Sequence, residues 1–125
     1  MGSWGDLKSE ELKFNVDAAV RGYFGRARIR VLRDHNGKVL AKFSKYIGLS
    51  NTLKAELLSI WEACVVLNFS KWVDFNHVCI ESDCLVVVNW LNQKGPTPAP
   101  FVVVVNQCKA LCASKGWVVR FVFRE

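Results

Sequence analysis

The sequence predicts an α/β domain built on a mixed five-stranded sheet, in which the first three strands are antiparallel and helices pack on the faces. Two observations carry this prediction. The first 46 residues contain segments that alternate hydrophobic and polar residues between turn signals, which is typical of an antiparallel meander. Later segments repeat their hydrophobic residues every three or four positions, and these helical segments alternate with short strands. A length of 125 residues, 51% of them hydrophobic, fits one domain with a sizeable core.

The three antiparallel strands are expected to begin at residue 12 and to include residues 26–33 and 38–46. In the first of them a hydrophobic face alternates with a polar face: Leu12, Phe14 and Val16 against Lys13, Asn15 and Asp17. A break is expected at the sequence GYFG (22–25). The sequence DHNG (34–37) is a strong turn signal, because Asn-Gly readily adopts positive φ.

A long helix is expected over residues 51–69, with Ser50 or Asn51 as its N-cap. Its hydrophobic residues recur at spacings of four and three and form one stripe: Leu53, Leu57, Ile60, Cys64 and Leu67. A fourth strand should follow at 77–82. A second helix is then expected over 83–93, where a Lys-Gly-Pro sequence ends it.

The segment 101–114 satisfies two patterns. Four consecutive valines favour a strand, whereas the spacing of Val104, Cys108 and Leu111 favours a helix. We expect a helix, because Gly116 then supplies a C-terminal stop. The last strand is expected over 117–123, and the predicted order is β-β-β-α-β-α-α-β.

Composition limits the class of protein and its surroundings. Basic residues exceed acidic residues by six, which suits a polyanionic partner and equally suits a solvated surface. The sequence shows no secretory signal, and its longest apolar run, 101–105, is far shorter than a membrane span. The five cysteines include no CxxC pair and are expected to be buried thiols in a reducing compartment. We therefore expect an intracellular domain of the cytoplasm or nucleus, monomeric and without a membrane partner.

Three carboxylates stand at strand ends or at a helix margin. Asp17 lies on the polar face of the first strand, and Asp83 joins the fourth strand to the next helix. At about 100° per residue, Glu56 falls roughly 60° from the centre of the apolar stripe, whereas Glu62 falls opposite it and is expected to be an ordinary exposed glutamate. Taken singly, these positions also suit a turn residue, a first-turn glutamate and an N-cap. Brought together by the sheet, the three carboxylates would form a site for Mg²⁺ or Mn²⁺.

Several motifs are specific in combination, through their order and spacing. They are LKFNVD (12–17), VLRDHNGKVL (31–40), AELL (55–58), IESDCLVVVNWL (80–91) and RE (124–125). On these motifs the chain resembles the plant ribonuclease-H-like domain of non-LTR retroelement reverse transcriptases and of related free-standing plant proteins. The resemblance covers residues 12–125 and leaves 1–11 as a lead-in.

The resemblance implies a function and a set of metal ligands. Asp17, Glu56 and Asp83 would be catalytic ligands of Mg²⁺ or Mn²⁺ in a ribonuclease that cuts the RNA strand of an RNA–DNA hybrid by two-metal hydrolysis. Such a protein reads the shape, phosphates and 2′-hydroxyls of its substrate more than the base sequence. Membership of a larger polyprotein is a further implication.

The chain departs from the family pattern at several positions. The usual glycine after the first-strand aspartate is Ala18, the GNPG-like loop reads GYFG (22–25), and Arg28 and Arg30 stand where the second strand usually has glycines. Phe121 replaces the usual histidine before the Arg-Glu pair. The family's fourth acidic residue follows that pair, so we expect a domain without the usual C-terminal helix.

These departures leave two functions open. The first is the hybrid ribonuclease, and the second is a catalytically weak or inactive module that binds nucleic acid or a protein partner. Contacts with nucleic acid are assigned to four residues: Arg26, Arg28, Arg30 and Asn51. The arginine pattern fits a phosphate-binding face and equally fits a solvated edge strand.

Overall fold

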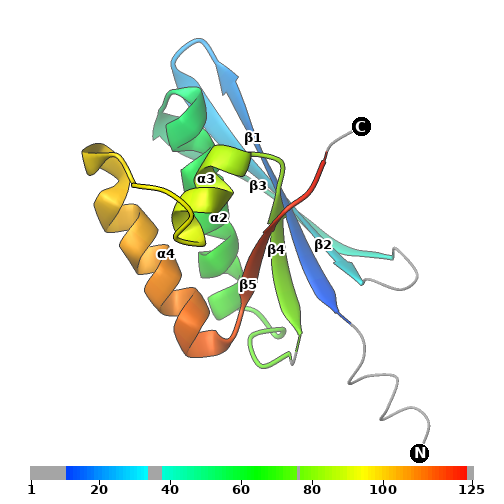
Figure 1. Cartoon of the computed structure of the whole chain (residues 1–125). Helices are drawn as coiled ribbons and strands as arrows, with labels where there is room; N and C mark the ends of the chain where they lie inside the picture. The colour runs from blue at the N-terminus through cyan, green and yellow to red at the C-terminus, as the bar shows by residue number, and fades with distance from the viewer. Residues whose placement is uncertain (1–10, 34–37, 76, 124–125) are drawn as a thin grey trace, which may run out of the picture.

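Five strands form a single mixed sheet in the order β3-β2-β1-β4-β5 (Figure 1). The structure is a computed structural model that describes residues 11–33, 38–75 and 77–123. The strands β1, β2 and β3 pair antiparallel, whereas β4 pairs parallel with β1 and with β5. The sheet predicted from the sequence is therefore confirmed. The strand bounds are β1 Leu12–Arg21, β2 Phe24–Arg33, β3 Val39–Leu49, β4 Val78–Ser82 and β5 Val118–Phe121.

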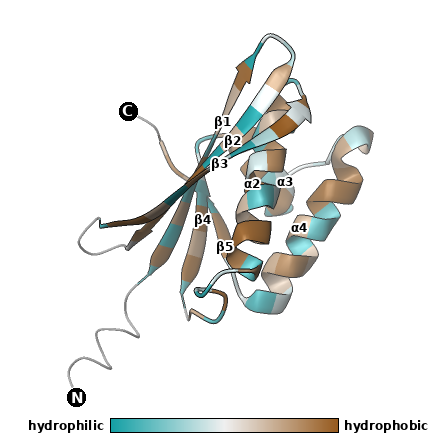
Figure 2. Ribbon diagram, turned by 180° about the vertical axis from the view of Figure 1, so that it is seen from behind, coloured by the Kyte–Doolittle hydropathy of each residue, from teal (hydrophilic) through white to brown (hydrophobic). Residues whose placement is uncertain are grey.

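Three α-helices lie together on one face of this sheet, as two opposite views show (Figures 1 and 2). They are α2 Thr52–Asn68, α3 Leu85–Leu91 and α4 Val102–Lys115. The element order agrees with the predicted order, and the valine-rich segment is helical. Gly116 ends α4 in the left-handed conformation at φ 73°, as expected. None of the described helices has the length and apolar character needed to cross a membrane.

The first hairpin is longer than the sequence suggested. Phe24 and Gly25, expected in a break, are the first residues of β2, because the strands are joined by a turn of only two residues. Gly22 has φ 63° at the first turn position, as a type II′ turn requires, and this geometry keeps the strands paired to their ends. The alternative that β2 is an edge strand is wrong, since it lies between β1 and β3.

The structure shows which residues begin helices α2 and α3. Asn51 is the N-cap of α2, because its Oδ1 accepts a hydrogen bond of 2.8 Å from the backbone N–H of Lys54. Helix α3 is shorter than expected and begins after Cys84, so neither Ser82 nor Asp83 is its N-cap. Instead, the Ser82 hydroxyl accepts a hydrogen bond of 3.1 Å from the Cys84 N–H, which holds the turn between β4 and α3.

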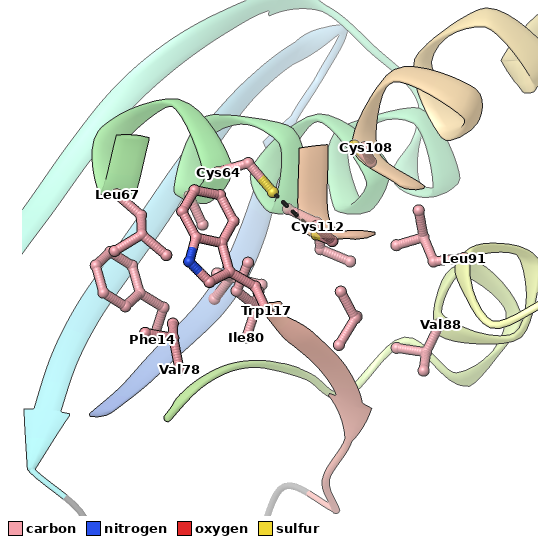
Figure 3. Packing of buried hydrophobic residues seen from close by; sticks show 14 of the residues in the cluster. Phe14, Cys64, Leu67, Val78, Ile80, Val88, Leu91, Cys108, Cys112 and Trp117 are labelled. Atoms are coloured by element: carbon pink, nitrogen blue, oxygen red, sulfur yellow. Dashed lines mark hydrogen bonds between the residues drawn. The ribbon is translucent and has the colours of Figure 1, made fainter. Parts of the chain in front are cut away.

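The core lies between the sheet and the helices and contains Phe14, Ile80 and Trp117 (Figure 3). All five cysteines are free, and four are buried. The Cys64 and Cys112 sulfurs lie 3.8 Å apart between α2 and α4. The predicted apolar stripe of α2 is buried except for Leu53. Leu53 lies in the first turn of the helix, before the part of α2 that packs on the core, and it is exposed.

Candidate metal centre

The site forms where β1 continues past the end of β4. The two strands pair from Leu12 with Val78 to Val16 with Ser82, and the pairing stops there. Asp17 is therefore the first residue of β1 that has left the β4 ladder, and Asp83 is the first residue after β4. The register brings these two residues side by side at a gap in the sheet.

Helix α2 supplies the third carboxylate. It packs across β1 and β2, and Glu56 lies in its second turn, only 8% exposed. Oxygen atoms of Asp17, Glu56 and Asp83 all lie within 4.8 Å of one another. Asp17 and Asp83 are half-buried, so the cluster is open to solvent on their side and closed on the side of α2.

The spacing of the carboxylates fits a divalent cation. Mg²⁺ binds oxygen at about 2.1 Å and larger hard cations bind at about 2.3–2.6 Å, so oxygens on opposite sides of one ion are roughly 4–5 Å apart. The observed oxygens lie within 4.8 Å of one another and so are close enough to bind the same ion. Carboxylates are the ligands that hard cations such as Mg²⁺ and Mn²⁺ prefer. The three side chains can therefore enclose one such ion with little movement.

Glu62, on the same helix, has a different environment. The sequence predicted an ordinary exposed glutamate, and this prediction is wrong. Glu62 accepts a hydrogen bond of 2.9 Å from the Lys45 ammonium group on β3, and its side chain is mostly covered. The long third strand reaches over α2 at this point, which the helical pattern alone did not indicate.

Sequence reasoning also missed an ion-pair network on the open face of the sheet, centred on the buried Glu81 of β4. The Arg120 guanidinium on β5 donates to Glu81 over 2.9 Å and to Glu11 over 3.0 Å, and Lys13 lies 4.0 Å from Glu81. The hydrogen bond to Glu81 raises the pKa of Arg120. The network depends on the register between β4 and β5, which places Glu81 beside Arg120, and local sequence patterns do not give this register.

The predicted nucleic-acid contacts fall in two places. Arg26, Arg28 and Arg30 are exposed on one face of β2, and Arg28 lies opposite Asp17 in the β1–β2 register. A groove of about 760 Å³ runs along this face. Its polar lining consists of Asn15, Asp17, Arg28, Arg30, Lys42 and Ser44. Asn51 is separate from the groove and lies in a second hollow beside the N-terminus of α2.

The strand order and the helices on one face of the sheet define a ribonuclease-H-like fold, and comparison with known proteins agrees. Residues 15–125 match the reverse transcriptase-like family, and the chain belongs to this family. No curated protein matches the chain at a significant level.

Several solved structures share the fold. LC11-RNase H1, isolated from compost by a metagenomic approach, is 21% identical, with a TM-score of 0.75 over 91% of this chain and 85% of that chain. The N-terminal RNase H domain of Rv2228c from Mycobacterium tuberculosis is 18% identical, with a TM-score of 0.76 over 93% and 84%. The protease–reverse transcriptase of prototype foamy virus is 14% identical, with a TM-score of 0.63 over 93% of this chain and 18% of that chain.

Proposed function

We propose that the chain is a metal-dependent endoribonuclease that cuts the RNA strand of RNA–DNA hybrids. The observation that carries this proposal is the convergence of Asp17, Glu56 and Asp83, whose oxygens lie within 4.8 Å of one another. A similar fold has been solved in complex with such a substrate, since LC11-RNase H1, 21% identical over 91% of this chain, has a structure with an RNA/DNA hybrid. The motif resemblance supports the same substrate.

In this proposal the three carboxylates would hold Mg²⁺ or Mn²⁺. Such an ion, when bound, polarises a phosphoryl oxygen and lowers the pKa of a bound water. Glu56 anchors the site, because its burial on the inner side of α2 restricts its position, whereas Asp17 and Asp83 are more accessible to the solvent from which substrate arrives.

The basic residues of the groove supply the second part of the proposed mechanism. Arg28 lies directly opposite Asp17 in the register, and side chains in such cross-strand pairs are about 5 Å apart at Cβ. Arg30 and Lys42 continue the positive charge along the same groove. A phosphate of the nucleic acid held by these side chains would lie next to the carboxylates, with its phosphodiester bond positioned for attack by water.

Cleavage of a labelled RNA–DNA hybrid in Mg²⁺ or Mn²⁺ tests the proposal. We expect the native chain to cut the RNA strand and Asp17→Asn to lose this activity while keeping its fold by circular dichroism. Glu62→Gln is the matched control, because Glu62 shares the helix of Glu56 but bonds Lys45 instead. A native chain that leaves the hybrid intact in both metals would refute the enzymatic proposal.

The second candidate is a module of the same fold that binds nucleic acid, or a protein partner, with little or no cleavage. The observation that favours it is the row of arginines beside Asp17, because Arg28 brings a positive charge to the edge of a site that must accept a cation. Hybrid affinity that survives in the native chain without cleavage would support this candidate.

We propose further that the chain is of the plant non-LTR retroelement type and works inside the cell. The order of the LKFNVD, AELL and IESDCL motifs supports the first point. Five cysteines that remain free thiols, although Cys64 and Cys112 touch, support a reducing compartment. Sequencing of the transcript around this reading frame tests the first point, and imaging of the tagged protein tests the second.

A further inference from the structure

An exposed hydrophobic patch covers the end of the sheet next to the first hairpin. We call it the aromatic patch, and it consists of Tyr23, Phe24, Tyr46 and Leu49. Their exposed fractions are 79%, 54%, 53% and 64%, respectively. The rings of Phe24 and Tyr46 are 6.1 Å apart with a tilt of 34°, so they form an adjoining pair rather than isolated side chains. Large rings that remain this exposed bring no folding energy in proportion to their size, which indicates a binding surface.

The patch is continuous with the basic face of the sheet. Phe24, Arg26 and Arg28 are alternate residues of β2 and therefore share one face, on which Tyr46 lies opposite Arg26. Arg28 in turn lies opposite Asp17 of the carboxylate cluster. Four residues of extended strand span about 13 Å, so the rings lie roughly four base steps of a duplex from the metal centre along this row.

The charge around the patch is positive. Arg21 lies opposite Phe24 in the register, and Arg26 follows one row further along. On the other side, Lys54 lines a hollow of about 730 Å³ together with Tyr23 and Leu49. The paired strand segments that carry the patch, 19–21, 24–27 and 44–49, contain no acidic residue. This surface therefore suits a polyanion that also offers flat apolar faces.

Single-stranded nucleic acid has this chemistry. Proteins that bind it combine a row of cations that follows the phosphates with aromatic side chains on which the bases stack. A paired duplex buries its base faces, so a ring can stack only on a base that has left the duplex. We propose that the aromatic patch stacks unpaired bases of a single-stranded segment that continues from a hybrid bound at the carboxylate cluster. This inference rests on the proposed function and adds a preference for hybrids with single-stranded extensions.

Fluorescence anisotropy with the full chain in EDTA tests this inference, because no cleavage occurs under these conditions. The probes are a blunt RNA–DNA hybrid and the same hybrid with a single-stranded extension of the RNA or of the DNA at either end. We expect the native chain to bind at least one extended hybrid roughly fivefold or more tightly than the blunt one, as one stacked base would provide. Phe24→Ala with Tyr46→Ala should remove this difference and leave affinity for the blunt hybrid unchanged.

The control variant is Phe69→Ala, which removes an aromatic side chain that is 84% exposed and lies beyond the last turn of α2. It should keep the full preference for the extended hybrid. Tyr46→Trp should keep it as well, because the larger ring still stacks, and this second variant guards against a folding defect in the double alanine variant. Equal affinity of the native chain for blunt and extended hybrids overturns the inference. A double alanine variant that keeps the preference for extended hybrids and changes only the self-association of the protein also overturns it. Failure to bind the blunt hybrid at all would count against the proposed function instead.

Discussion

Glu56→Gln should stabilise the metal-free protein and abolish its stabilisation by metal. The three carboxylates place negative charges within 4.8 Å of one another. At this distance two unit charges repel by about 3 kcal/mol at an effective dielectric constant of 20 and by about 1 kcal/mol in water. Because Asp17 and Asp83 are half-buried, each pair falls between these limits. Because Glu56 takes part in two of these pairs, we expect the neutral amide to raise the free energy of unfolding by about 2–6 kcal/mol, which is a rise in Tm of about 6 °C or more.

Metal should reduce this difference in stability between the native chain and Glu56→Gln. A ligand that binds only the native state stabilises it by about 1.4 kcal/mol at ten times its Kd. The native chain should therefore gain several degrees in Tm when Mg²⁺ or Mn²⁺ is added after EDTA treatment. Glu56→Gln lacks one of three ligands and should gain much less, so that the two proteins converge as metal concentration rises.

Differential scanning fluorimetry of both proteins over a metal titration measures these changes. Glu62→Gln is the control, because it removes one charge from the same helix but breaks the ion pair with Lys45. That variant should lose up to about 1 kcal/mol of stability in EDTA and keep the full response to metal. A Glu56→Gln variant that is no more stable than the native chain in EDTA would contradict this prediction, as would an equal response of the two proteins to metal.

Other predictions follow from the fold. Arg120→Leu should lower the unfolding free energy by about 1–3 kcal/mol, because it leaves the buried Glu81 with less compensation, and adding Glu81→Gln should recover part of this loss in urea titrations. Asn51→Ala should cost about 1 kcal/mol in the same assay, because the Lys54 N–H loses its acceptor, whereas Asn51→Gly should cost only a few tenths. Burial raises the pKa of Cys79 to about 11 from an ordinary 9.0, so the native state keeps a proton that the unfolded chain releases. The free energy of unfolding should therefore fall by about 3 kcal/mol as the pH rises from about 9 to about 11, and a Cys79→Ala variant should show a smaller decline.

The sequence was sufficient for the elements and their order, because short-range patterns determine them. Alternation around Phe14 and the stop at Gly116 depend on residues within a few positions of each other. It was also sufficient to separate Glu56 from Glu62, since helical geometry places them on different sides of α2. The exposed end of the stripe, Leu53, was predicted wrongly because the pattern does not show where the core ends.

Contacts between distant strands could not be predicted in this way. The bond from Lys45 to Glu62 and the pairing of Glu81 with Arg120 depend on how far β3 extends and on the β4–β5 register. A shift of one residue would move every side chain of a strand to the other face. Hydrophobic patterns define which face of a strand is buried, but they do not fix which partner lies opposite on the polar face.

The unequal lengths of β1 and β4 connect the metal centre with the basic face. If β4 were longer, its ladder would close the gap beside Asp17, and Glu56 could not approach from the side of α2. The part of β1 beyond this gap, from Asp17 to Arg21, still pairs with β2, and this pairing places Phe24, Arg26 and Arg28 of β2 beside it. The proposed substrate contacts on β2 thus lie next to the metal ligand Asp17 on β1 but use different side chains. Arg30→Ala on β2 should therefore lower hybrid affinity without altering the response to metal, whereas Glu56→Gln on α2 should lower the response to metal without lowering hybrid affinity in EDTA.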